Sequence, residues 1–179
     1  EASKNVSLAK TITLREKMFK ELHPMSIAFV QAYQQKNEDN LEKIKVKYAP
    51  QLTIIDNILL QHELPTNLKY LAVIESELSN SAISHKGAVG PWQFMATTGR
   101  LMGLTINRNK DERRNLVKST HAAAKYLKDL YGHFNDWLLV IAAYNGGASR
   151  VDYAIKKSHS DDFWKLQYYL PAESRMHVK

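Results

Sequence analysis

The sequence has 179 residues, 44% of them hydrophobic and 24% charged, and a formal net charge of +7. This length is enough for one domain with a real core, and the composition excludes a disordered chain. The positive charge predicts attraction to an anionic partner: nucleic acid, acidic lipid or an anionic cell-wall polymer. Charge alone does not choose among these three.

Cysteine is absent, which excludes a disulfide scaffold and a thiolate metal site. The seven histidines show no HExxH or comparable ligand spacing, so we expect no metal and no cofactor. The sequence has no run of about 18 apolar residues, so no transmembrane helix is predicted. Residues 1–10 are polar and lack a signal-peptide core, and the chain starts without Met, so we expect a trimmed or mature fragment.

Helical patterns dominate the chain, whereas glycine (7) and proline (5) are scarce, and the fold class is therefore predicted to be mainly α. Residues 1–12 are expected to be a frayed start, and residues 80–110 to be rich in loops. The expected helices span 13–22, 24–35, 37–48, 51–64, 66–79, 112–132, 137–145, 148–157 and 161–167. We expect residues 1–50 to form a helical lead-in packed on the core, and residues 51–179 to form the functional domain.

Specific residues are expected to begin or end these helices. Pro50 is expected to break the helix before it. Gly132 is a plausible end for the long helix over 112–132. Asp136 is expected to cap the helix over 137–145, and Gly146 and Gly147 to end it.

Glu75 stands out because it lies in an apolar stripe of its predicted helix. Leu68, Leu71, Ala72 and Leu78 all lie within about 60° of it around the helix axis, whereas Glu77 lies about 200° away. Desolvation raises the pKa of a carboxyl in such surroundings, and a raised pKa suits a general acid. The alternative is a structural glutamate at a helix end, or one paired with a nearby Lys or Arg.

Most glycoside hydrolases use two carboxylates that flank the scissile bond. Here the acids at Asp111, Asp136, Asp152 and Asp161 come from separate segments, and nothing in the sequence brings one of them opposite Glu75. A single acid suffices when the substrate's own acetamido group acts as the nucleophile.

Five motifs follow one another along residues 50–179. They are LPTNLKYLAVIES, which holds Glu75 and Ser76; SHKGAVGPWQFM; ERRNLVKSTHAAAKYLKDL; DWLLVIAAYNGG; and YLPAES. In this order the motifs resemble those of the lytic transglycosylases of glycoside hydrolase family 23. That resemblance implies a lysozyme-like helical domain of the goose type, with a loop-rich groove for the substrate.

The resemblance also implies a role for each matching residue. Glu75 would be the sole catalytic acid and base. The residues expected to bind substrate are Ser76, Ser84, Gln93, Met95, Tyr144, Asn145, Tyr169 and Glu173. Pro91, Lys86 and His177 depart from the family's pattern, which affects the expected preference for particular sugars.

Several of these residues have a simpler interpretation. Trp92 is more readily a core aromatic than a platform for sugar, and Gln93 can satisfy backbone groups of its own loop. Tyr144 fits an amphipathic helix with a polar tip. A role limited to allowing tight turns is the simpler interpretation for four glycines, Gly87, Gly90, Gly146 and Gly147.

The family resemblance implies peptidoglycan glycan strands as the partner, and cleavage of the bond between N-acetylmuramic acid and N-acetylglucosamine. It implies a bacterial envelope location, periplasmic or at the outer membrane, with membrane association through a segment outside this sequence left open. We expect a monomer. The alternatives are a muramidase, a non-catalytic peptidoglycan-binding module, and a basic nucleic-acid-binding protein; scattered, acid-interleaved charges disfavour the last.

Overall fold

The computed structural model describes residues 24–178. They form two compact units: residues 34–126, and residues 24–33 together with 127–178. The predicted helix over 13–22 and the start over 1–12 lie outside the described residues. The expected division of the chain at residue 50 remains a prediction.

The fold is helical, as predicted, and β-structure in the described part is confined to isolated bridges. Helix α2 runs without interruption over Pro24–Lys47, where two helices were expected, because no glycine or proline separates them. Helix α3 spans Ala49–Gln61. Pro50 lies in its first turn, a position that tolerates proline, so the predicted break is in fact a helix start.

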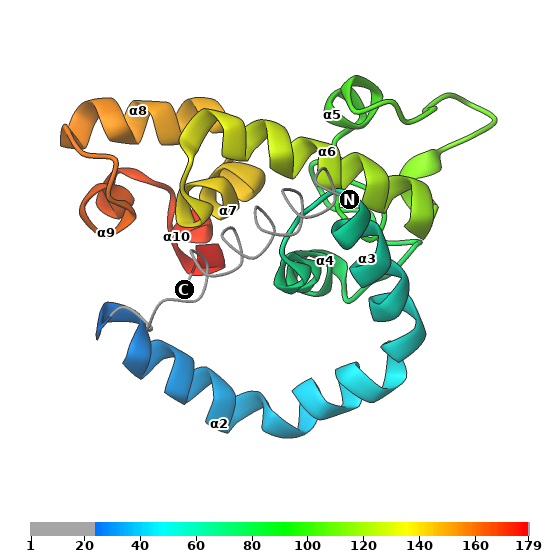
Figure 1. Cartoon of the computed structure of the whole chain (residues 1–179), viewed down its shortest axis with the longest axis horizontal. Helices are drawn as coiled ribbons and strands as arrows, with labels where there is room; N and C mark the ends of the chain where they lie inside the picture. Colours follow the sequence, from blue (N-terminus) through cyan, green and yellow to red (C-terminus); the bar gives the residue numbers. More distant parts are fainter. Residues whose placement is uncertain (1–23, 179) are drawn as a thin grey trace, which may run out of the picture. The chain divides into compact units, whose positions relative to one another are not determined.

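The first unit also holds η1, α4, α5, η2 and the start of α6 (Figure 1). The 3-10 helix η1 (Thr66–Leu68) leads into α4 (Lys69–Ser76), and both pack against α3. Helix α5 (Ala96–Leu101) lies inside the segment predicted to be loop-rich. The 3-10 helix η2 (Glu112–Arg114) precedes α6 (Leu116–Phe134), which continues past Gly132, so that predicted end was wrong.

In the second unit, α7 (Trp137–Gly146) begins and ends as predicted. The carboxylate of Asp136 accepts hydrogen bonds from the backbone N–H groups of Leu138 (2.8 Å) and Leu139 (3.1 Å), and Gly147 follows with φ of 90°. Helix α7 packs against α8 (Ala148–Ser158) and α10 (Ala172–Val178).

The rest of the second unit consists of α9 (Phe163–Leu166) and η3 (Gln167–Tyr169), which pack against α8. Helix α10 has no counterpart among the predicted helices. No helix of the described residues has the length and apolar character to cross a membrane.

Candidate functional site

Glu75 lies near the end of α4, beside the apolar stripe that the sequence predicted. Leu68, Leu71, Ala72 and Leu78 are all buried, with exposed fractions of 6% or less, and Glu75 itself is half-buried. Glu77 is exposed, so the two neighbouring acids do not share an environment. Glu75 is therefore the acid of α4 that borders the core.

Helix α4 ends one residue after Glu75, three residues earlier than expected. Glu77 and Leu78 both have left-handed backbone conformations, with φ of 51° and 61°. Residues other than glycine adopt this backbone conformation only at a cost in free energy. Such residues are often found at functional sites. The sequence carries no glycine there, so nothing in its pattern signalled the sharp end of the helix.

Ser76 fastens the end of α4 to the loop that follows. Its hydroxyl donates a hydrogen bond to the carbonyl oxygen of Pro91 at 2.9 Å and accepts one from the backbone N–H of Ser79 at 3.2 Å. Because both bonds are internal, the geometry favours a positioning role for Ser76. Its predicted contact with substrate remains a prediction.

Ser84 opens a tight turn at the start of the loop. Its backbone N–H donates to the carbonyl of Ala88 (2.9 Å), and its hydroxyl oxygen accepts from the N–H of Ala88 (3.0 Å). No described residue accepts its hydroxyl proton, which leaves that proton for an external acceptor. Gly87, with φ of 84°, closes the turn.

Gln93 has a left-handed backbone, with φ of 47°. Its side-chain amide N–H and its backbone N–H both donate to the carbonyl of Gly90, at 2.8 and 3.1 Å. The amide oxygen is the remaining acceptor of this half-buried side chain. Met95 follows at the start of α5 and is 44% exposed.

Trp92 is completely buried, which confirms its interpretation as a core aromatic. Its indole N–H donates to the hydroxyl of Thr120 on α6 at 2.9 Å. Phe94 is also buried and lies 6.3 Å, centroid to centroid, from the ring of Tyr126. Burial raises the pKa of Tyr126. These contacts attach the loop to α6.

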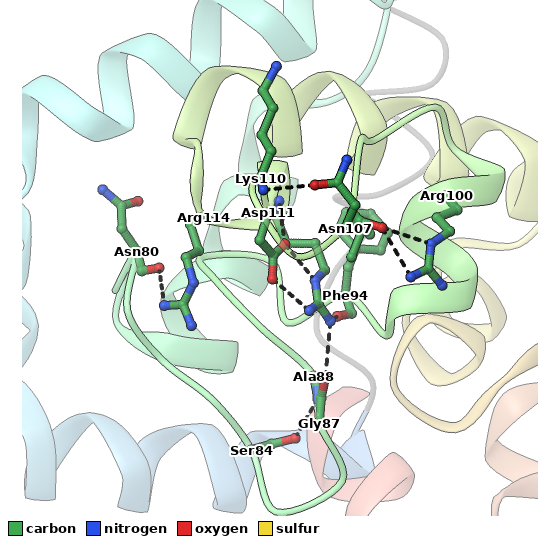
Figure 2. A network of polar contacts seen from close by, with 12 residues as sticks. Asn80, Ser84, Gly87, Ala88, Phe94, Arg100, Asn107, Lys110, Asp111 and Arg114 are labelled. Carbon is green, nitrogen blue, oxygen red and sulfur yellow. Dashed lines mark hydrogen bonds and ion pairs between the residues drawn. The ribbon is translucent and has the colours of Figure 1, made fainter.

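Arg113 is a residue of this site that the sequence did not reveal. Its guanidinium donates to the carbonyls of Gly87 (3.1 Å) and Phe94 (3.0 Å), and to both carboxylate oxygens of Asp111 at 2.9 and 2.7 Å (Figure 2). The Arg113 side chain lowers the pKa of Asp111. Nothing in the ERR triplet distinguishes a buried arginine from a solvated one.

Glu112 anchors the neighbouring loop over 105–111. Its buried carboxylate pairs with Lys110 at 2.7 Å and with Lys118, and accepts from the N–H of Thr105 at 2.8 Å. These partners hold its pKa well below the usual range. Arg100 of α5 also donates to this loop, at the carbonyl of Ile106 (Figure 2).

The second unit holds the other four predicted residues. Asn145 accepts a hydrogen bond from the Ser174 hydroxyl at 3.0 Å, and its amide nitrogen lies 3.4 Å from Nδ1 of His177. Both bonds join α7 to α10, so the geometry gives Asn145 a positioning role. Tyr144 is half-buried on α7, Tyr169 is 50% exposed in η3, and Glu173 is exposed in the first turn of α10.

The structure thus gathers the predicted residues into two groups. In the first unit, a hydrogen bond ties Ser76, the neighbour of Glu75 at the end of α4, to the loop over 84–95, which holds Ser84, Gln93 and Met95. In the second unit, Asn145 on α7 is hydrogen-bonded to Ser174 of α10, the residue after Glu173. Within the described residues, no three His, Asp or Glu side chains gather as a metal site would require.

Among the acids weighed as a second carboxylate, three have structural partners. Asp111 pairs with Arg113, Asp136 caps α7, and Asp152 lies 2.8 Å from His133. Asp56 and Glu112 of the first unit are also in ion pairs. These five carboxylates are therefore held in structural contacts.

Comparison with known proteins agrees with this geometry. The model of the transglycosylase SLT domain matches residues 54–167. The chain is 37% identical to the membrane-bound lytic murein transglycosylase D of Escherichia coli K12 over 148 residues, 80% of this chain and 32% of that protein. The chain therefore spans about a third of the length of this relative.

Two further relatives are similar over shorter stretches. A putative tributyltin chloride resistance protein of Alteromonas sp. is 36% identical over 107 residues, 59% of this chain and 52% of that protein. An inactive mutant of lytic transglycosylase Slt from Pseudomonas aeruginosa shares the fold, with a TM-score of 0.59 and 22% identity over 70% of this chain and 22% of that one. The resemblance read from the motifs is thereby confirmed: this chain belongs to the transglycosylase SLT domain family.

Proposed function

We propose that the chain is a peptidoglycan lytic transglycosylase that cleaves the β-1,4 bond between N-acetylmuramic acid and N-acetylglucosamine without water. The observation that carries this proposal is the hydrogen bond from Ser76 to Pro91, which holds the helix end bearing a half-buried glutamate against a rigid loop. Membership of the SLT family and the name of the murein transglycosylase relative support it.

In the proposed mechanism, neutral Glu75 donates a proton to the glycosidic oxygen as the bond to C1 of the muramic acid breaks. The acetamido oxygen of the same sugar attacks C1 and gives an oxazolinium-like intermediate. The Glu75 carboxylate then takes the proton of the C6 hydroxyl, and that oxygen closes a 1,6-anhydro ring. The proton that Glu75 gives up in the first step returns in the second, so no water is consumed.

The loop over 84–95 would orient the acetamido group for this attack. The amide oxygen of Gln93, to which no described residue donates, would accept from the acetamido N–H, and the hydroxyl of Ser84 would donate to a sugar oxygen. Exposed Met95 offers an apolar wall. Tyr144, Tyr169 and Glu173 of the second unit are likewise proposed to bind substrate.

The bacterial envelope is the proposed location, because the substrate lies there and a relative is described as membrane-bound. The net charge of +7 favours a polymer that carries lactyl and peptide carboxylates.

Mass spectrometry of the products released from purified peptidoglycan tests this proposal. We expect anhydro-muramic products. They are lighter than the products of hydrolysis by about 18 Da, because no water is added when the bond is cleaved. Products with reducing ends would instead show a muramidase. Binding to the polymer without release would show a binding module.

A further inference from the structure

The Arg113 guanidinium lies beneath the loop over 84–95, and its side chain is only 9% exposed. Four N–H bonds account for most of its donors: two to Asp111 and two to loop carbonyls. A buried arginine is costly unless it is fully paired, so this arrangement is a built structure and not a surface contact.

The two carbonyls that Arg113 binds lie at opposite ends of the loop. Gly87 closes the Ser84 turn, since its N–H donates to the carbonyl of Ser84 at 2.9 Å. Phe94 lies directly between Gln93 and Met95. One planar group therefore fixes the distance between the turn that presents Ser84 and the turn that presents Gln93.

The backbone of Arg113 supports the middle of the same loop. A Cβ added at Gly90 would lie 2.0 Å from the carbonyl oxygen of Arg113, so the two backbones are in direct contact there. Gly90 in turn accepts both hydrogen bonds of Gln93. Arg113 thus touches the loop at three places, 87, 90 and 94.

Asp111 determines how the guanidinium is oriented. Its two oxygens bind Nε and Nη2, which leaves Nη1 directed at the two carbonyls. A lysine in this place would present a single ammonium and would not reproduce the planar fork.

We propose that Arg113, oriented by Asp111, is a positioning residue that sets the spacing between Ser84 and Gln93 and so the fit of the N-acetyl sugar. It acts through the loop and touches no substrate. The expected effect on substrate binding and turnover rests on the proposed function. The expected effect on the order of the loop rests on the loop geometry alone.

Arg113→Lys tests the proposal, with Arg114→Lys as the matched control. Arg114 is the adjacent residue, and its one described side-chain hydrogen bond, to the carbonyl of Asn80, is long at 3.4 Å. For Arg113→Lys we expect the apparent KM for isolated glycan strands to rise roughly tenfold, the effect of one lost charged hydrogen bond, with a smaller change in kcat. Arg114→Lys is expected to keep the wild-type values.

Hydrogen exchange of the loop amides gives a second readout that does not depend on activity. The N–H groups of Ala88, Val89 and Gln93 are bonded within the loop, and we expect them to exchange faster in Arg113→Lys than in Arg114→Lys. If Arg113→Lys does not fold, Asp111→Asn keeps the guanidinium and is expected to change both readouts in the same direction by a smaller factor.

The possible outcomes separate the two proposals. A folded Arg113→Lys protein with unchanged KM and unchanged exchange overturns the positioning role, as does an equal effect in both variants. If the wild-type chain releases no product, the proposed function fails. In that case, faster exchange and weaker binding of an N-acetylglucosamine oligomer in Arg113→Lys alone still support the positioning role, and their absence overturns it.

Discussion

The hydroxyl of Ser76 lies 2.9 Å from the carbonyl oxygen of Pro91, and this bond joins the residue after Glu75 to the loop that holds Gln93. Fifteen residues separate the two partners along the chain. Pro91 is buried, so its carbonyl has no ready replacement for this donor. The contact thus couples the position of the proposed acid to that of the proposed sugar-binding loop.

Ser76→Ala removes this contact and leaves a buried carbonyl without a donor. We expect a loss of about 1–2 kcal/mol in the free energy of unfolding and a fall in turnover of roughly tenfold, because the acid and the loop no longer hold one geometry. Urea unfolding and product release measure the two effects. Ser81→Ala, at an exposed hydroxyl of the same segment, serves as control; equal losses in both variants would contradict the role of the contact.

Gly90 and Gly87 form a matched pair that separates backbone conformation from close packing. Both have φ above +80°, but a Cβ at Gly90 would lie 2.0 Å from the Arg113 carbonyl oxygen, whereas one at Gly87 meets nothing within 4 Å. We expect Gly87→Ala to cost about 1–2 kcal/mol, and Gly90→Ala to cost about 3 kcal/mol more or to prevent folding. Similar unfolding midpoints for the two variants would show that the contact with Arg113 is dispensable.

Gly146 allows α7 to approach α10 closely. A Cβ there would lie 2.5 Å from Oγ of Ser174, the group that donates to Asn145. Gly146→Ala is therefore expected to break that bond, at about 1 kcal/mol. In a Ser174→Ala background the nearest atom is 3.5 Å away, so the same change should become neutral or stabilising by up to about 1 kcal/mol. A double-mutant cycle measures this, and additive effects would contradict the predicted contact.

Acid should weaken the fold through Glu112 and Asp111. Lys110 and Lys118 lower the pKa of Glu112, and Arg113 lowers that of Asp111, so the folded protein binds fewer protons than the unfolded chain. Their contribution is complete above the unfolded-state values of about 4 and is lost as pH falls below them. Glu112→Gln should reduce stability at neutral pH and flatten the decline between about pH 5 and pH 2.

Denaturant unfolding at a series of pH values measures this slope. Glu77→Gln removes an exposed carboxylate of the same unit and serves as control. If the Glu112→Gln curve ran parallel to that of the wild type, the ion pairs of Glu112 would not be the source of the acid sensitivity.

Periodicity and capping chemistry predicted those features that depend on neighbours along the chain. The apolar stripe around Glu75 followed from helical phase, and the cap at Asp136 from the residue before an apolar run. The burial of Trp92 also agreed with prediction. The stripe and the cap each involve residues within a few positions of one another, whereas the burial of Trp92 follows from its large apolar ring.

Features that depend on distant partners could not be predicted from the pattern. Arg113 binds carbonyls 19 and 26 residues away, and the backbone offers no sequence signal for an acceptor. The left-handed Glu77 and Gln93 stand where glycine is usual, so the helix end and the loop geometry carried no marker. The contact of Gly146 with Ser174 depends on α10, a helix that the sequence did not predict.

The activity of Glu75→Gln, measured beside Glu77→Gln on purified peptidoglycan, tests the central claim most directly. The first change removes the proposed acid, and the second removes the exposed neighbour on the same turn. We predict that Glu75→Gln folds, binds glycan strands and loses turnover by a factor on the order of 1,000, while Glu77→Gln retains wild-type turnover. Anhydro-muramic products released by Glu75→Gln at the wild-type rate would contradict the account.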